Sequence, residues 1–277
     1  MPEQEKAKFW RDTTLGELEL LRAQYVTHAF APHIHEGYAI GVIEAGAEGF
    51  LYRGAYHVAP AGTMVALNPG ERHTGEAAAR SGWTYRMLYP EARLLQQAAA
   101  EVAGRSRAMP FFGRCVIRDE LVAQWLLNLH AALEEGVSVL ERESRLLWVL
   151  AHLVSRHADD RPSPPALRPE RESVRRAREY IEQCYAGNIL LEDLARAANH
   201  SPFHLLRVFR REVGLPPHAY LTLVRVRQAK RLLAEGRPIL EVAAQTGFSD
   251  QSHLTRHFKR LVGVTPGQFA AASHPRG

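Results

Sequence analysis

Residues 241–266 read EVAAQTGFSDQSHLTRHFKRLVGVTP, and residues 193–217 read DLARAANHSPFHLLRVFRREVGLPP. The two stretches align as a repeat, with an offset of 48 residues up to Ser201 and Ser249 and of 49 residues after them. An internal repeat is considered before any single motif, because the repeat determines the architecture of the chain. Each copy has apolar residues at helical spacing on both sides of a short turn, so each copy predicts two helices joined by a tight turn.

The turn residues and the segment between the copies support this prediction. Ser201 precedes Pro202 and is predicted to cap the second helix of the first copy. In the second copy Gly247 supplies the turn, and Ser249 is predicted to cap a helix that runs to about residue 262. Residues 217–236 have apolar side chains at helical spacing. This connecting helix is long enough to hold the two units at a fixed separation.

The basic charge of the chain lies in this repeated half. Residues 168–277 contain 18 basic and 10 acidic side chains, a net charge of +8, whereas residues 1–167 have a net charge of −3. The second helix of a helix-turn-helix unit enters the major groove, where Arg can bond guanine and Gln can bond adenine. A single copy of the pattern could also be just two packed helices with a solvated basic surface. Two copies in register on a basic domain favour double-stranded DNA as the partner.

Side chains near the start of each second helix would meet base edges, and the basic pairs one turn later would meet phosphates. The DNA-contact candidates are Phe203, His204, Leu206, Arg207, Arg210 and Arg211 in the first copy, and Gln251, Ser252, His253, Arg256, Lys259 and Arg260 in the second.

Residues 175–272 resemble the DNA-binding domain of the AraC/XylS family of transcriptional regulators. The resemblance is carried by LA at 194–195 with SPFHLLRVF at 201–209, and by EVA at 241–243 with GFSDQSHLTRHFKR at 247–260 and GVTP at 263–266. It implies two helix-turn-helix units on one connecting helix, inserted into successive major grooves. By family position the base contacts come from Phe203, Leu206, Arg207, Gln251, Ser252, His253 and Arg256. Leu206 is a departure, because related proteins often have a polar residue there, so base reading by the first unit is expected to depend mostly on Arg207.

The first half of the chain has a different pattern. Residues 18–90 break into short apolar runs separated by Gly, Pro and Asn, which predicts an antiparallel barrel or sandwich. Residues 91–157 change to helical spacing and predict two antiparallel helices joined near Gly136. Their apolar faces could cover the β domain or pair with a second subunit through Trp125 and Trp148. The proline-rich and charged residues 159–172 are predicted to be a linker. The fold class is therefore α+β with two domains, residues 1–158 and 173–277, the second being all-α.

His33 and His35 lie on one face of a predicted strand, since side chains alternate with period two. His73 follows the stretch NPGER at 68–72. Residues 25–90 thus resemble the two short motifs of cupin barrels, and the domain order matches AraC-type regulators whose cupin-like half senses a small molecule. The effector-binding candidates are His33, His35, Tyr38 and His73.

The resemblance to metal-binding cupins is incomplete. In those proteins a carboxylate usually follows the histidine pair after three or four residues, but Ala39 and Ile40 stand there, and Glu36 should point away from both histidines. His33, His35 and His73 could still hold Zn²⁺ or Fe²⁺. They could equally make polar contacts to a ligand without metal, or be purely structural.

The sequence predicts an effector-responsive transcriptional regulator without catalytic activity. Two different functions compete with this prediction: a metal-dependent cupin enzyme with an appended DNA-binding module, and a nucleoid-type DNA binder that responds to no effector. A homodimer is expected, and RNA polymerase is a candidate partner.

Two cysteines without a CxxC pair exclude a disulfide framework, and no export signal or membrane span is evident. The cytoplasm is therefore the expected location.

Overall fold

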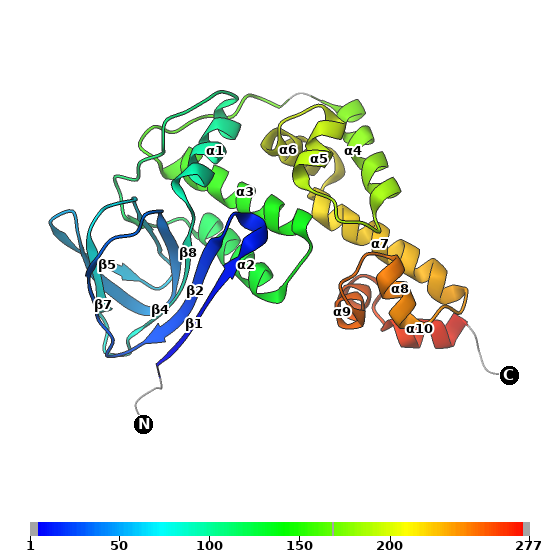
Figure 1. Ribbon diagram of the computed structural model, residues 1–277, viewed down its shortest axis with the longest axis horizontal. Helices are drawn as coiled ribbons and strands as arrows, with labels where there is room; N and C mark the ends of the chain where they lie inside the picture. Colours follow the sequence, from blue (N-terminus) through cyan, green and yellow to red (C-terminus); the bar gives the residue numbers. More distant parts are fainter. Residues whose placement is uncertain (1–4, 168, 274–277) are drawn as a thin grey trace. The chain divides into compact units, whose positions relative to one another are not determined.

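The computed structural model describes residues 5–167 and 169–273 (Figure 1). Three parts of the predicted organisation lie outside the described residues: residues 1–4 at the start of the first domain, residue 168 of the linker, and residues 274–277 at the end of the second domain. The chain divides into an N-terminal unit, Met1–Val137 with Arg145–Ala166, and a C-terminal unit, Ser138–Ser144 with Leu167–Gly277. The prediction of an α+β chain with two domains is confirmed.

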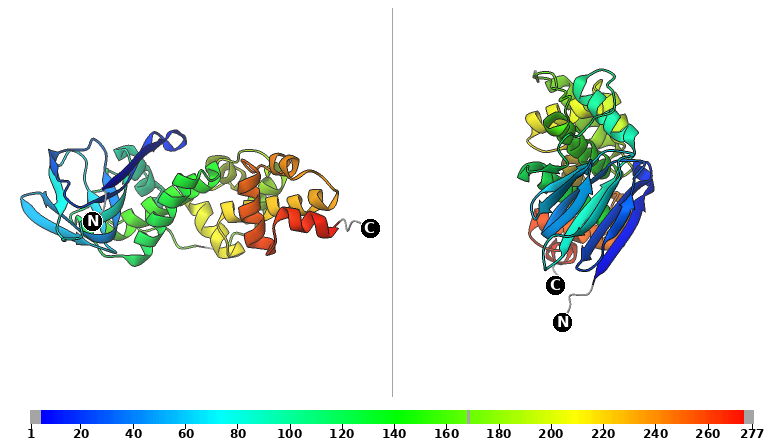
Figure 2. Two further views of the ribbon diagram at one scale, coloured as in Figure 1. Left: turned by 90° about the horizontal axis from the view of Figure 1, so that it is seen from below. Right: turned by 90° about the vertical axis from the view of Figure 1, so that its left-hand side faces the viewer.

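The strands of the N-terminal unit form two antiparallel layers (Figure 2). The first layer contains, in spatial order, β1 (Lys6–Asp12), β2 (Leu18–Tyr25), β8 (Trp83–Tyr89), β4 (Ala39–Tyr52), β6 (Met64–Leu67) and β9 (Val116–Ile117). The second layer contains β3 (Phe30–His33) and β7 (His73–Ala77) with the end of β4 and β5 (Ala55–Pro60).

β4 belongs to both layers. Residues 39–42 pair with β6, and residues 47–52 pair with β5. The sequence pattern predicted only short runs within residues 18–90, but the structure has one strand of fourteen residues here, which continues through Gly46 with a φ of 70°. A Cβ atom at Gly46 would lie 1.9 Å from the carbonyl oxygen of Gly82. Glycine is therefore required where the strand crosses from one layer to the other.

Helices cover one face of the sheet. α1 (Ala92–Ala103), α2 (Glu120–Glu135) and α3 (Val139–His157) follow the strands, and α2 packs on β4 and β8. Gly136, in a left-handed conformation, ends α2 at the predicted junction. One apolar core joins the sheet to these helices, which confirms that their apolar faces cover the β domain. Trp125 and Trp148 are half-buried and meet edge to face with their ring centroids 5.8 Å apart.

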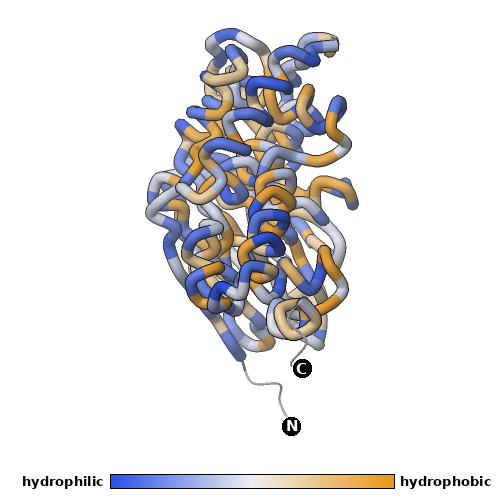
Figure 3. The backbone as a smooth tube through the Cα atoms, turned by 90° about the vertical axis from the view of Figure 1, so that its right-hand side faces the viewer, coloured by the Kyte–Doolittle hydropathy of each residue, from blue (hydrophilic) through white to orange (hydrophobic). Residues whose placement is uncertain are grey.

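The C-terminal unit is helical, as predicted. It contains α4 (Arg171–Cys184), α5 (Leu191–Ala198), α6 (Pro202–Val213), α7 (Pro217–Ala234), α8 (Ile239–Gln245), α9 (Gln251–Val262) and α10 (Pro266–Ser273). Hydrophilic and hydrophobic residues alternate along these helices (Figure 3). The pairs α5–α6 and α8–α9 are the two predicted helix-turn-helix units, and α7 is the predicted connecting helix. α4 begins at Arg171, inside the predicted linker.

Within residues 5–167 and 169–273, no helix is both long and apolar enough to cross a membrane.

Candidate ligand pocket and DNA interface

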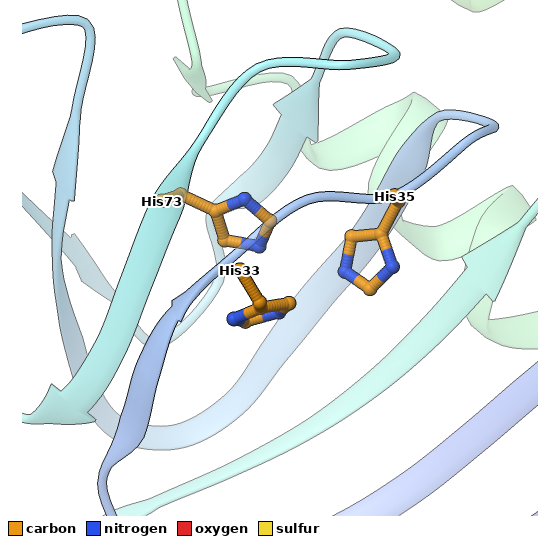
Figure 4. Close-up of side chains that lie close together, drawn as sticks. All are labelled: His33, His35 and His73. Atoms are coloured by element: carbon orange, nitrogen blue, oxygen red, sulfur yellow. The ribbon is translucent and has the colours of Figure 1, made fainter.

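Three histidines converge on the inner side of the second β layer (Figure 4). His33 at the end of β3 is the direct register partner of His73 at the start of β7. His35 follows two residues later, and Ile34 between them is 59% exposed, as the predicted alternation requires. The ring centroid of His33 lies 4.3 Å from that of His73 and 4.9 Å from that of His35. One ring nitrogen from each residue lies within 4.8 Å of the other two.

Backbone carbonyls set the tautomers of two of these rings. Nδ1 of His33 lies 2.9 Å from the carbonyl oxygen of Ala31, and Nδ1 of His73 lies 3.3 Å from that of Glu71. A carbonyl oxygen only accepts, so Nδ1 carries the proton and Nε2 of a neutral ring keeps its lone pair. Burial lowers the pKa of both His35 and His73 to about 4. Neutral imidazoles with available lone pairs therefore face one another at neutral pH.

A small cavity of about 80 Å³ adjoins the three rings. Glu48 lines it from β4, and burial raises the pKa of this carboxyl to about 8. The acid is thus a hydrogen-bond donor at neutral pH. The remaining lining residues are Phe30, Ala39, Phe50, Val65, Leu67, Thr74, Tyr85, Met87 and Tyr89.

Glu48 is the pocket residue that sequence reasoning missed. A carboxylate was expected three or four residues after the histidine pair, whereas Glu48 lies thirteen residues after His35 on another strand. The sequence could have indicated this position, because Glu48 alternates with Phe50 and Tyr52. Both of these residues are buried on the inner side of β4.

Tyr38 is a correction to the predicted effector set. Its side chain is buried in the core between the sheet and the helices, where the hydroxyl donates to the carbonyl of Pro110 and the ring meets Phe112 edge-on. The neighbouring Ala39 lines the cavity. Because successive side chains of an extended chain point to opposite faces, Tyr38 points away from the cavity.

The second helix-turn-helix unit presents most of its predicted DNA contacts to solvent. Leu254 and Phe258 are buried on one side of α9. The predicted contacts that are exposed on this helix are Gln251, Ser252, Arg256, Lys259 and Arg260. The cap of this helix is Asp250 and not Ser249, since Oδ1 of Asp250 accepts a hydrogen bond of 2.7 Å from the backbone NH of His253.

His253 is held against the turn. Its Nδ1 lies 3.0 Å from Oγ of Ser249, and its ring meets Phe248 edge-on at 5.2 Å. The side chain is half-buried, so it presents less surface to DNA than its exposed neighbours on α9.

The first unit differs from the prediction. Phe203 and Leu206 are only 3% and 2% exposed, so both belong to the core and not to the base-reading surface. The spacing that brings them near Arg207 also places them on the apolar side of α6, which explains the error. Arg210 and Arg211 are exposed.

Two candidates of the first unit are half-buried and already in contact with other side chains. The guanidinium of Arg207 lies 5.9 Å from the ring centroid of Phe203. Nε2 of His204 lies 2.9 Å from a carboxylate oxygen of Glu170.

Known families match both halves of the chain. The family model described as an AraC-like ligand binding domain matches residues 15–150, and one described as a helix-turn-helix domain matches residues 194–272. YbfI of Bacillus subtilis (strain 168), an uncharacterized HTH-type transcriptional regulator, is 34% identical over 238 residues, which cover 86% of each protein. The chain belongs to the AraC family of transcriptional regulators. This AraC-family protein is thus a DNA-binding regulator with an N-terminal ligand-binding domain.

Two further similarities of the AraC-family protein are confined to part of its length. The arabinose operon regulatory protein of Escherichia coli (strain K12) is 36% identical over 107 residues, which cover 37% of this chain and 36% of that protein. The solved C-terminal domain of AraT, a response regulator from Geobacillus stearothermophilus, is 34% identical, with 36% of this chain and 84% of that chain covered and a TM-score of 0.35.

Proposed function

We propose that the regulator senses a small polar molecule in the cavity between His33, His35, His73 and Glu48. The observation that supports this is the convergence of three imidazoles and a protonated carboxyl on one cavity inside the ligand-binding domain. Buried polar groups are normally satisfied within the protein, so a set that faces a shared cavity is suited to an incoming ligand. Occupancy would shift the balance between two states of the protein by the difference in effector affinity between them.

The chemistry of the lining indicates a neutral or cationic effector. Among the residues that line the cavity, none is a lysine or an arginine. An anion would enter without a compensating charge, and burial of an unpaired charge is costly. The imidazole lone pairs accept hydrogen bonds, while Glu48 and the hydroxyl groups of Tyr85 and Tyr89 can donate them.

A metal ion is the second form of this proposal. His33, His35 and His73 offer three nitrogen ligands, a set that Zn²⁺ or Fe²⁺ accepts with a remaining position for water or effector. Nδ1 contacts to the carbonyls of Ala31 and Glu71 orient two of the rings as outer partners of metal-bound histidines do. The ion would supply a Lewis-acidic point of attachment for the effector.

We further propose that the protein acts as a homodimer in the cytoplasm, without catalytic activity, and that it contacts RNA polymerase when bound at a promoter. The dimer would use α2 and α3, where the half-buried Trp125 and Trp148 provide large aromatic surfaces.

Base reading is assigned mainly to α9 and Arg207, and phosphate contacts to the basic pairs Arg210–Arg211 and Lys259–Arg260.

The pocket is tested by thermal denaturation of the full chain against small sugars, amines, amino acids, Zn²⁺ and Fe²⁺, with and without chelator. A ligand present at 100 times its Kd stabilises by about 2.7 kcal/mol, which gives a clear rise in Tm. We expect His73→Ala and Glu48→Leu to abolish the rise while basal DNA affinity is retained. Ile34→Ala, on the opposite face of the same strand, is the matched control.

The result distinguishes the three roles of the histidines. If they are only structural, His73→Ala lowers the Tm of the free protein but leaves the ligand-induced rise intact, and the proposal is wrong. A rise that requires Zn²⁺ or Fe²⁺ and disappears with chelator identifies the metal form. A rise that persists with chelator identifies direct polar contacts to an organic effector.

A further inference from the structure

A second group of metal-type ligands lies in the C-terminal unit. Glu170 is the residue immediately before α4, His200 precedes α6 by two residues, and His204 is in the first turn of α6. One ligand atom from each of the three lies within 4.8 Å of the other two. The chain thus brings together residues separated by 34 positions through the packing of α4 on α6.

The contacts within this group are direct. Nε2 of His204 lies 2.9 Å from one carboxylate oxygen of Glu170, and Nε2 of His200 contacts the other oxygen. The His200 nitrogen is nevertheless buried and forms no hydrogen bond with any other described residue. The two rings lie 4.6 Å apart between centroids. Both imidazoles therefore contact the same carboxylate. Nε2 of His200 lacks a well-directed hydrogen bond.

The donor types suit a transition metal. Two imidazole nitrogens and one carboxylate oxygen, with water in the fourth position, are the ligands of open zinc sites. The three side chains are 20–23% exposed, which leaves an entry path and room for that water. Ligand atoms around tetrahedral Zn²⁺ are about 3.3 Å apart when each bond is about 2.0 Å long. The three ligand atoms, which lie within 4.8 Å of one another, are therefore already close to the spacing that a tetrahedral ion requires.

We propose that Glu170, His200 and His204 form a binding site for a divalent transition metal of the zinc class. The ion joins the residue before α4, where the chain enters the C-terminal unit, to His200 just before α6 and to His204 in its first turn. It stabilises the entry of the first helix-turn-helix unit and removes His204 from the side chains available to DNA. This site is separate from the three-histidine pocket and uses none of its residues.

Arg176 is the charged neighbour that opposes a cation at this position. Its guanidinium donates to the carbonyl of Ala198 at 3.3 Å and pairs with the carboxylate of Glu172 at 3.7 Å. The positive charge is thus directed to acceptors outside the ligand group, one of which, Glu172, also pairs with Arg175 at 2.6 Å.

The test counts zinc bound to the full chain. Protein stripped with chelator is loaded with Zn²⁺, desalted and measured by atomic spectrometry, in a His33→Gln/His73→Gln background that disables the pocket cluster. We expect one Zn²⁺ per chain in this background and its loss in Glu170→Gln and in His204→Gln. Removal of a ligand should weaken any residual binding by more than the loss of an outer-shell partner, which alone costs about 10–100-fold. Glu192→Gln, an exposed carboxylate on α5, is the matched control and should keep the ion.

Circular dichroism in the presence of chelator shows whether each variant is folded. If the His33→Gln/His73→Gln protein is unfolded, the same comparison is made in the wild-type chain. There Glu170→Gln should lose one of the bound zinc ions, and in protein loaded with Co²⁺ it should alter the visible spectrum of the bound ion. The proposal is overturned if Glu170→Gln and His204→Gln retain as much zinc as Glu192→Gln, or if the parent chain binds none at this position. Because the readout is a metal count, failure of DNA binding or of effector sensing would leave it unaffected.

Discussion

Arg207 and Arg256 are equivalent residues of the two repeats, but the structure gives them different surroundings. Arg256 is exposed on α9, whereas Arg207 is half-buried beside the ring of Phe203, and burial lowers the pKa of its guanidinium. Arg remains charged in proteins at neutral pH, so both can bond guanine. Because Arg256 is more exposed than Arg207, we expect the second unit to make the larger contribution to base reading.

Replacement of Arg256 by alanine should relax the sequence preference at one base pair. Loss of a bidentate contact to guanine costs about 1–3 kcal/mol at that position. Lys259→Ala, one turn later on the same helix, should weaken binding to all sequences alike, because phosphate contacts do not distinguish bases. Selection from randomised sites with each variant measures the difference.

Arg207→Ala is the companion variant. It should relax a different base pair, about 10 base pairs away, since α7 keeps the two units apart. Relaxation of the same base pair by Arg207→Ala and Arg256→Ala, or a uniform loss of affinity with Arg256→Ala, would contradict the assignment.

At the level of elements, β4 positions the ligand pocket. Its first half carries Ala39 and its second half carries Glu48 and Phe50, and all three line the same cavity. This is possible only because the strand passes between the layers at Gly46, just after its register with β8 shifts between Ile43 and Ala45. The pocket therefore depends on one glycine that does not line it.

Gly46→Ala should destabilise the N-terminal unit by more than about 4 kcal/mol, a loss expected only for severe packing faults. The new Cβ atom would lie 1.9 Å from the Gly82 carbonyl and force β4 away from β8. Gly54→Ala is the control, because Gly54 has a similar φ of 80° but a Cβ atom added there would have no other atom within 4 Å. It should cost only about 1–2 kcal/mol, the strain of a left-handed alanine. Chemical denaturation measures both, and equal losses would show that backbone strain alone limits Gly46.

Across the whole molecule, charge is separated between the two halves. The net charge of +8 in residues 168–277 coincides with the two helix-turn-helix units, and the net charge of −3 in residues 1–167 belongs to the ligand-binding half. A polyanion should therefore bind the C-terminal half and be repelled weakly by the other.

Residues 168–277 expressed alone should bind duplex DNA, and residues 1–167 should not. The logarithm of the association constant should fall linearly with the logarithm of salt concentration, with a slope of about −0.9 for each phosphate neutralised. Arg210→Ala and Lys259→Ala should each reduce that slope by about one phosphate. Fluorescence anisotropy over a range of salt concentrations provides the measurement. A C-terminal fragment that is folded by circular dichroism but does not bind at low salt would refute this prediction.

Local spacing in the sequence was sufficient to predict the repeat, the connecting helix, the helix end at Gly136 and the shared face of His33 and His35. These features depend on hydrogen bonds and periodicities within a few residues, which the order of residue types expresses directly. The domain order and the basic half also follow from the sequence.

Tertiary packing decided which faces are buried. Leu206 has the spacing of a recognition residue, but it is only 2% exposed. Tyr38 is adjacent to the pocket strand, but the alternation of side chains directs it into the core between the sheet and the helices. Glu48 enters the pocket only because β4 continues into the second layer, and Glu170 meets His204 only because α4 packs on α6. The sequence determines which side chains share a face of an element, whereas contacts between distant elements determine whether that face meets a core, a cavity or solvent, because burial is a property of the assembled neighbours.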